Sequence, residues 1–109
     1  MSAKFVKIES SSQLDELFER SYSEPVILLK HSNTCGISLD VLEQTAGING
    51  VVNVVVVQED RAISNEIAER TGHRHHSPQA FVIRNGKPLY HATHYGIDPE
   101  SIENLLKAN

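Results

Sequence analysis

The sequence contains a single cysteine, Cys35, in 109 residues. One cysteine cannot form a disulfide within the chain, and this removes the usual reason to expect secretion. The first residues lack the apolar run of a signal peptide, and no segment approaches the ~20 apolar residues of a membrane span. We therefore expect a cytoplasmic protein with no membrane partner.

The sequence also lacks an excess of basic residues. Ten Lys and Arg stand against 14 Asp and Glu, and the formal net charge is −4. A chain without a broad basic face is not expected to bind nucleic acid. Its 39% hydrophobic and 22% charged residues are near the values of soluble globular proteins. This length is sufficient for a hydrophobic core and too short for two domains, so we expect a single domain over residues 1–109.

Two hydrophobic periodicities alternate along the chain, one typical of strands and one typical of helices. Ser11 and Ser12 are expected to cap the first helix, and Asn85-Gly86 is typical of a two-residue hairpin turn. The expected strands lie near residues 5–8, 26–31, 51–57, 80–83 and 89–92, and the expected helices near 13–20, 36–47, 63–72 and from 99 onward.

The resulting order is β-α-β-α-β-α-β-β-α. Parallel strands joined by helices, followed by one hairpin, predict an α/β fold with a mixed sheet flanked by helices on both faces. The run 51–57 is rich in β-branched residues and has no polar alternation, so it is expected to be buried on both faces. A cysteine directly after the second strand of this order is typical of the thioredoxin-like fold, which by itself fixes no activity.

Cys35 stands between the strand 26–31 and a helix that begins near Gly36. The first N–H groups of a helix have no partner within the helix and carry partial positive charge, which favours thiolate over thiol. The thiolate is the form that attacks disulfides. This position therefore predicts thiol chemistry, with a buried and inert cysteine as the alternative.

Ser38 occupies the place that a second cysteine takes in a C-x-x-C oxidoreductase. Its hydroxyl cannot form a disulfide, but from the first helical turn it can donate a hydrogen bond to a Cys35 thiolate. A C-x-x-S protein has to pass its mixed disulfide to an external thiol. We predict a monothiol mechanism with Cys35 and Ser38 as catalytic residues and Thr34, Gly36 and Ile37 as the active-site turn.

Ser77-Pro78-Gln79 comes just before the strand 80–83. In thioredoxin-like folds a cis-proline at this place sets the backbone of the preceding residue beside the active cysteine, where it can pair with an extended substrate. We therefore expect a cis bond before Pro78, although a trans proline is also tolerated at a strand start. Ser77 and Pro78 are predicted to bind substrate.

Four residues, His73-Arg74-His75-His76, lead into this proline. Adjacent histidines occur at metal sites, but a closed structural site usually has four ligands and no second ligand cluster accompanies these. No metal is expected. A loop near Cys35 that carries Arg74 and partly protonated histidines favours a thiolate and an anionic ligand instead. Arg74 and His76 are predicted to bind substrate.

Taken together, these segments resemble the YtxJ family, the bacillithiol-system monothiol bacilliredoxins of low-GC Gram-positive bacteria. The similarity extends over about residues 4–107. The blocks that carry it are Lys30-His31-Ser32, Thr34-Cys35-Gly36-Ile37-Ser38, Val57-Gln58-Glu59-Asp60-Arg61, Ser64-Asn65-Glu66-Ile67-Ala68-Glu69, Gly72-His73, Ser77-Pro78-Gln79 and His91-Ala92-Thr93-His94.

The resemblance implies a thioredoxin fold and a stress-response reductase that acts on mixed disulfides between proteins and bacillithiol. Cys35 is then the nucleophile that accepts bacillithiol, which is the thiol cosubstrate. The implied partners are bacillithiolated proteins and a low-molecular-weight thiol that regenerates the enzyme. Bacillithiol carries carboxylates on its malate part, and Arg74, His75 and Lys30 are candidate contacts for them. Gly36 replaces the proline that the family commonly has after the cysteine, so the turn is expected to be less rigid.

Two alternatives remain from the residues. Cys35-Gly36-Ile37-Ser38 differs at one position from the C-G-F-S motif of monothiol glutaredoxins, which bind iron–sulfur clusters with glutathione. The segment after the hairpin lacks the Gly-Gly-x-Asp that glutaredoxins use to hold the thiol, so an iron–sulfur cluster carrier is the second hypothesis. The third is a stress-associated binding protein whose thiol is modified without turnover.

Overall fold

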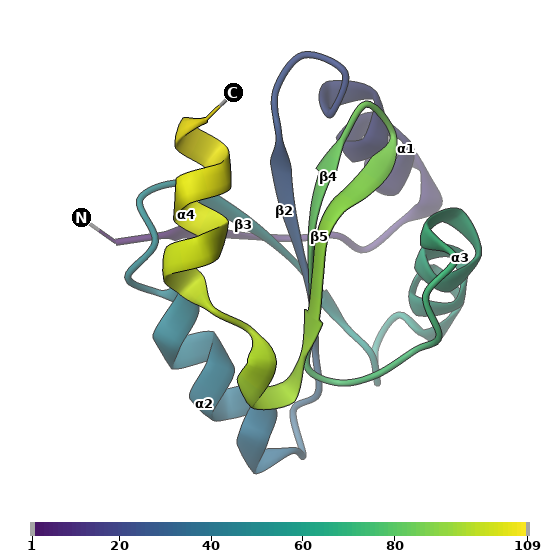
Figure 1. Ribbon diagram of the computed structural model, residues 1–109. Coiled ribbons are helices and arrows are strands. Elements are labelled where there is room, and N and C mark those ends of the chain that lie inside the picture. Colours follow the sequence, from purple (N-terminus) through teal and green to yellow (C-terminus); the bar gives the residue numbers. More distant parts are fainter. Residues whose placement is uncertain (1, 109) are drawn as a thin grey trace.

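The computed structural model describes residues 2–108 and contains a five-stranded sheet between helices. In chain order the elements are β1 (Lys4–Lys7), α1 (Ser11–Arg20), β2 (Val26–His31), α2 (Gly36–Thr45), β3 (Val51–Val56), α3 (Arg61–Thr71), β4 (Gln79–Arg84), β5 (Lys87–Thr93), the 3-10 helix η1 (His94–Gly96) and α4 (Pro99–Lys107). Figure 1 shows α2 and α4 on one side of the sheet and α1 and α3 on the other.

The strand order across the sheet is β1-β3-β2-β4-β5. β1, β3 and β2 run parallel, whereas β4 is antiparallel to β2 and β5 is antiparallel to β4. The predicted α/β class and the mixed sheet are therefore confirmed. The order differs from the prediction in one element, η1, which lies between β5 and α4. A three-residue turn of this kind is too short to leave a hydrophobic periodicity in the sequence.

β2 is buried along its whole length, and its successive side chains enter opposite helical layers. Val26 and Leu28 pack in one cluster with residues of α1 and α3. Ile27 and Leu29 pack in the other cluster, with residues of α2 and α4. By the same alternation the strand ends with Lys30 on the α1/α3 side and His31 on the α2/α4 side.

The N-cap of α1 is Ser10. The prediction that Ser11 and Ser12 cap this helix is therefore wrong. The Ser10 Oγ accepts a hydrogen bond from the backbone N–H of Gln13 at 3.1 Å. Three adjacent serines offer the same capping chemistry, so the sequence alone does not distinguish between them.

The hairpin between β4 and β5 turns at Asn85 and Gly86, as predicted. Their φ angles of 55° and 75° lie in the left-handed region, the combination of a type I′ turn. Ser21 holds this turn against the end of α1. Its carbonyl oxygen accepts the Asn85 N–H at 2.8 Å, and its Oγ accepts the Gly86 N–H at 2.9 Å.

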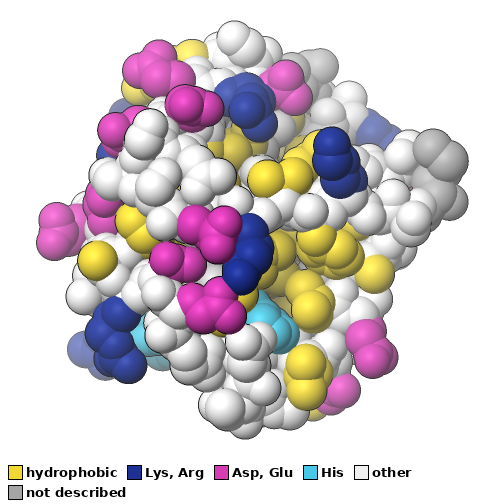
Figure 2. All heavy atoms as spheres, turned by 180° about the vertical axis from the view of Figure 1, so that it is seen from behind, with side chains coloured by type: hydrophobic (Ala, Val, Ile, Leu, Met, Phe, Trp, Pro, Cys, Tyr) yellow, Lys and Arg dark blue, Asp and Glu magenta, His cyan; other side chains and the backbone are white. Residues whose placement is uncertain are grey.

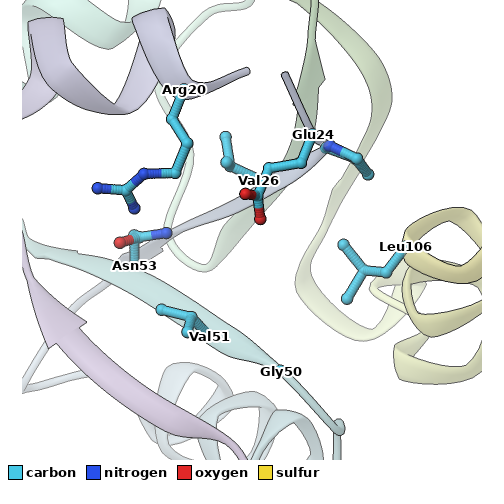
Figure 3. Close-up of a pocket in the computed structure, with 8 residues that line it drawn as sticks. Arg20, Glu24, Val26, Gly50, Val51, Asn53 and Leu106 are labelled. Carbon is cyan, nitrogen blue, oxygen red and sulfur yellow. The ribbon is translucent and has the colours of Figure 1, made fainter. Parts of the chain in front are cut away.

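A cavity opens where β2 and β3 begin, at the sheet edge opposite to Cys35 (Figure 3). Val26 and Val51 are the first residues of these two strands, and Leu106 of α4 lines the same cavity. Figure 3 shows the Arg20 side chain reaching toward Asn53 across it. This cavity is therefore remote from the thiol.

The surface turned toward the viewer in Figure 2 mixes charges of both signs. Acidic side chains gather beside an apolar area, and the basic side chains are scattered singly over this face. None of the helices within residues 2–108 is long and apolar enough to cross a membrane.

The substitution Gly86→Ala is expected to lower the free energy of unfolding by about 1–2 kcal/mol. The φ of 75° disfavours a side chain, and an added Cβ would lie 2.5 Å from the Tyr22 hydroxyl oxygen. Gly96→Ala is the matched control, because a Cβ there meets nothing within 4 Å. Urea unfolding of the three proteins checks this, and equal effects of the two substitutions would contradict it.

Candidate active site

Cys35 is the N-cap residue of α2, the helix that follows β2. Its φ and ψ of −106° and 119° are extended, and its carbonyl oxygen accepts a helical hydrogen bond from the Leu39 N–H at 3.2 Å. Gly36 and Ile37 form the first turn of α2, and a Cβ on Gly36 would meet nothing within 4 Å. The partly exposed, free thiol thus stands at the N–H groups of a helix start.

The start of α2 lowers the pKa of the Cys35 thiol below its ordinary value of 9.0. The backbone N–H of Ser38 has the largest effect, the Ser38 hydroxyl and the Ile37 N–H add to it, and burial opposes them. A lowered pKa raises the thiolate fraction near neutral pH. Both the helix start and the loop with Arg74 and charged histidines were expected to favour the thiolate, and the groups that lower this pKa are those of the helix start.

The Ser38 hydroxyl is unusual in its burial and in its hydrogen bonding. The side chain is 1% exposed, and within residues 2–108 its oxygen has no hydrogen-bond partner. Buried hydroxyls normally have a partner. This hydroxyl lowers the pKa of the Cys35 thiol, so it is a donor that the ionised sulfur can use.

Gln58, which follows β3, fixes the turn before Cys35. Its Oε1 accepts the Asn33 N–H at 3.1 Å, and its Nε2 donates to Ser32 Oγ at 2.7 Å and to Thr34 Oγ1 at 3.1 Å. The exposed Thr34 is therefore held by hydrogen bonds. Gln58 was not among the predicted site residues. It follows a buried parallel strand, and the carboxyl ends of such strands lie at the same edge of the sheet. This position could therefore have identified Gln58 as a residue of the site.

The Ser77–Pro78 peptide bond is cis. Pro78 directly precedes β4, whose first residue, Gln79, pairs with Lys30 near the end of β2. The Ser77–Pro78 segment therefore lies at the sheet edge where β2 leads into the Cys35 turn. Ser77 is partly exposed, whereas Pro78 is buried.

η1 connects this segment to α2. The Pro78 carbonyl oxygen accepts the His94 N–H at 3.0 Å, and the next residue, Tyr95, donates its hydroxyl to Asp40 Oδ2 of α2 at 2.7 Å. The hydrogen bond to Asp40 raises the pKa of Tyr95, and burial and the negative charges of Asp40 and Cys35 raise it further. Tyr95 thus lies near the thiol. It was not among the predicted site residues, because η1 is too short to leave a hydrophobic periodicity in the sequence.

The side chains of Arg74, His75 and His76 lie at the surface. Gln79 holds their loop from below, because its buried amide donates from Nε2 to the Arg74 carbonyl oxygen at 2.8 Å and accepts the His76 N–H at 3.4 Å. Arg74 and His76 are therefore presented on a loop that is fixed to the sheet just before Ser77.

His73 and His91 pack as a pair against the sheet. Their rings stack with centroids 3.8 Å apart. Burial lowers the pKa of His91, and the nearby His73 and His76 lower it further. Within the part of the chain that the structure describes, the potential metal ligands that converge within 4.8 Å of one another are Glu9, Glu59 and Asp60, a group without histidine.

The structure corrects the prediction that Lys30 contacts a bound thiol. The side chain is 0% exposed, because the alternation of β2 points it between the sheet and the α1/α3 layer. There Nζ donates to the Ser64 carbonyl oxygen at 2.8 Å and to His75 Nδ1 at 3.3 Å. Burial lowers the pKa of Lys30 to about 8. Its amine therefore interacts with the interior of the protein and not with a ligand at the surface.

Ser38→Ala is expected to raise the pKa of the Cys35 thiol, because one of the groups that lower it is lost. The pKa is expected to stay below that of a free thiol, since the Ser38 and Ile37 N–H groups remain. Thr34→Val is the matched control, because the hydrogen bonds of Thr34 go to other residues. Titration of the thiolate absorbance near 240 nm measures all three proteins, and an unchanged pKa in Ser38→Ala would remove Ser38 from the account.

Raising the pH from about 7.5 to about 9.5 is expected to stabilise the wild type relative to Lys30→Met by about 2 kcal/mol. The pKa of Lys30 is about 8 in the folded protein against an ordinary value of 10.5. Between these values the unfolded chain binds more protons than the folded one, so stability rises as the pH rises. Urea unfolding of both proteins at both pH values measures the difference between their free energies of unfolding. Groups that titrate in the same way in the two proteins cancel in this difference. A difference that is independent of pH would contradict the lowered pKa.

Comparison with known proteins finds relatives over nearly the whole chain. The family model described as monothiol bacilliredoxin BrxC matches residues 6–102. A protein provisionally described as an oxidoreductase with a thioredoxin fold has a similar structure, with a TM-score of 0.84, 30% sequence identity, and coverage of 93% of this chain and 92% of that chain. The thioredoxin of Trypanosoma brucei brucei has the same fold, with a TM-score of 0.74, 15% identity, and coverage of 96% and 89%. A mutant thioredoxin of Halobacterium salinarum NRC-1 has a TM-score of 0.68, 16% identity, and coverage of 96% and 89%.

These matches agree with the geometry around the thiol. The range 6–102 includes both Cys35 and the Ser77–Pro78 segment. The thioredoxin fold, with a cysteine at the start of α2, supports a thiol oxidoreductase. The chain belongs to the monothiol bacilliredoxin family.

Proposed function

We propose that this protein removes bacillithiol from protein mixed disulfides through Cys35. The observation that carries the proposal is a single cysteine with a lowered pKa at the start of α2, with Ser38 where a second cysteine would stand. Membership in the monothiol bacilliredoxin family points to bacillithiol as the thiol. The proposed partners are bacillithiolated proteins and a low-molecular-weight thiol, and no step of the proposed cycle uses a metal.

In the first step the Cys35 thiolate attacks the bacillithiol sulfur of the mixed disulfide. A bond forms between the two sulfurs as the original S–S bond breaks, and the electron pair leaves on the sulfur of the substrate protein. That sulfur takes a proton from water, and the substrate protein is released as a free thiol. The N–H groups of α2 and the Ser38 hydroxyl favour the attacking thiolate.

In the second step an external thiolate, such as free bacillithiol, attacks the bacillithiol sulfur on Cys35. The new disulfide is released, and the electron pair returns to Cys35 as a thiolate. A sulfur whose pKa is lowered is a better leaving group, so the groups that favour attack also favour release. The external thiol therefore supplies the electrons that a second cysteine of the chain would otherwise provide.

Substrate binding is assigned to the surface around Cys35. Ser77 and Pro78 contribute the backbone facing the thiol, and Thr34, Gly36 and Ile37 contribute the turn. The basic groups for the malate carboxylates of bacillithiol are the exposed Arg74 and His76.

His75 is less available to bacillithiol than the sequence suggested. Its Nδ1 lies within hydrogen-bond distance of Lys30 and Ser64, and its Nε2 lies within that distance of Ser77. Both ring nitrogens therefore have partners within the protein.

We place the proposed reaction in the cytoplasm, where a chain with one free thiol stays reduced between turnovers. The reaction is expected to be needed under oxidative stress.

The experiment follows intact masses while the reduced protein is incubated with a protein that carries one bacillithiol. The wild type is expected to gain one bacillithiol as the substrate loses it, and free bacillithiol then restores the wild-type mass. Cys35→Ser is expected to gain none and to leave the substrate modified. The same substrate modified with glutathione is the control for the identity of the thiol, and it is expected to react more slowly.

Persistent modification of the substrate beside an unmodified wild-type Cys35 would contradict the proposed function. Equal rates with glutathione and bacillithiol would contradict the choice of thiol. Modification of Cys35 that free bacillithiol never reverses would show a thiol acceptor without turnover.

A further inference from the structure

Two buried polar side chains support the loop that precedes Pro78. Lys30 of β2 and Gln79 of β4 are both fully buried and lie opposite each other in the sheet. Opposite residues of an antiparallel pair point to the same face. Gln79 binds the backbone of the loop, whereas Lys30 reaches it through the side chain of His75.

The groups around His75 fix which of its nitrogens carries the proton. Nδ1 lies 3.3 Å from Lys30 Nζ and 3.1 Å from Ser64 Oγ. An ammonium group has donors only, so Nδ1 is an acceptor and the neutral ring carries its proton on Nε2. Nε2 lies 3.2 Å from Ser77 Oγ and donates to it. A single imidazole thus connects a buried charge to the residue before Pro78.

We propose that Lys30 is a positioning residue for substrate binding: its ammonium group orients His75, and His75 holds Ser77 at the edge of the Cys35 site. The identity of the substrate rests on the proposed function. The contacts from Lys30 through His75 to Ser77 do not depend on it.

The burial of this ammonium group calls for a specific role. Burying a charge is costly unless it is paired or hydrogen-bonded, and the partners of Lys30 are a backbone carbonyl and an imidazole. An apolar side chain of similar size would avoid that cost. A methionine at this position could not donate a hydrogen bond to His75. The amine therefore contributes a donor where packing alone would favour an apolar residue.

Lys30 acts on the loop and not on the thiol. The groups that shift the pKa of Cys35 are Ser38, Ile37 and burial, and Lys30 is not among them. The proposal therefore separates two functions within one site. α2 sets the reactivity of the sulfur, and Lys30 sets the position of the segment that receives the substrate.

The charges that face His75 keep its ring neutral. They come from three segments: Lys30 on β2, Arg61 at the start of α3 and His76 on its own loop. Burial lowers the pKa of His75 most, and the three basic groups lower it further. A neutral ring is required for Nδ1 to accept from Lys30. Removal of the Lys30 charge is therefore expected to raise the pKa of His75.

The first test is imidazole ¹⁵N NMR of the full chain, with His75 assigned through His75→Asn. Wild-type His75 is expected in the Nε2–H tautomer near pH 7. In Lys30→Met the pKa of His75 is expected to rise and the Nδ1–H tautomer to gain population. Ser64→Ala is the matched control, because it removes a hydroxyl from Nδ1 but keeps the carbonyl that Lys30 binds. The Nε2–H tautomer is expected to persist there.

The second test measures steady-state kinetics with a bacillithiolated protein. Lys30→Met and His75→Asn are each expected to raise KM about fivefold, the effect of losing one hydrogen bond. The thiol pKa of Cys35 is expected to stay at its wild-type value in both. The double variant is expected to raise KM no further than either single variant, because both changes break the same connection.

A wild-type His75 in the Nδ1–H tautomer would overturn the proposal without the need for any variant. Unchanged KM values in both single variants, or effects that multiply in the double variant, would also overturn it. The proposed function fails separately if no substrate transfers bacillithiol while His75 shows the expected tautomer and pKa change. In that case the positioning of Ser77 by Lys30 still holds.

Discussion

The complete burial of β2 is the constraint on which the rest of the structure depends. Its six residues are enclosed by α1 and α3 on one face and by α2 and α4 on the other. Apolar contacts on both faces fix the depth and the register of the strand. α2 starts shortly after β2 ends, so this register also fixes where Cys35 stands. The same enclosure forces the Lys30 amine into the interior, and the contacts that connect it to the loop before Pro78 follow from that burial.

The activation of the thiol uses neutral donors. Backbone N–H groups of α2 and the Ser38 hydroxyl lower the pKa of Cys35, and no basic side chain is needed for this. Because the thiol needs no basic side chain, the exposed Arg74 and His76 are available in the proposed cycle for the carboxylates of the thiol substrate. It also explains how one serine can stand where a dithiol enzyme has its second cysteine. Ser38 stabilises the ionised sulfur, and an external thiol performs the resolution.

Features that depend on neighbouring residues in the sequence were predictable, and features that depend on packing were not. The Asn85-Gly86 turn follows from local backbone preferences, and the Cys35 junction follows from a strand signal that meets a helix signal. The orientation of Lys30 was not predictable, because in a strand that is apolar on both faces the alternation does not show which face a polar residue joins. Gln58 follows a buried parallel strand, a signal that could have placed it at the site, whereas Tyr95 lies on η1, which leaves no hydrophobic pattern in the sequence.

The most direct test of the account is the pH dependence of the second-order rate constant for uptake of bacillithiol by Cys35 from a modified protein. The account predicts that the rate rises with the thiolate fraction and that the midpoint of this rise lies below pH 9.0, the ordinary pKa of the thiol. A midpoint at or above pH 9.0 would show that the start of α2 does not activate this cysteine. That result would contradict the central claim.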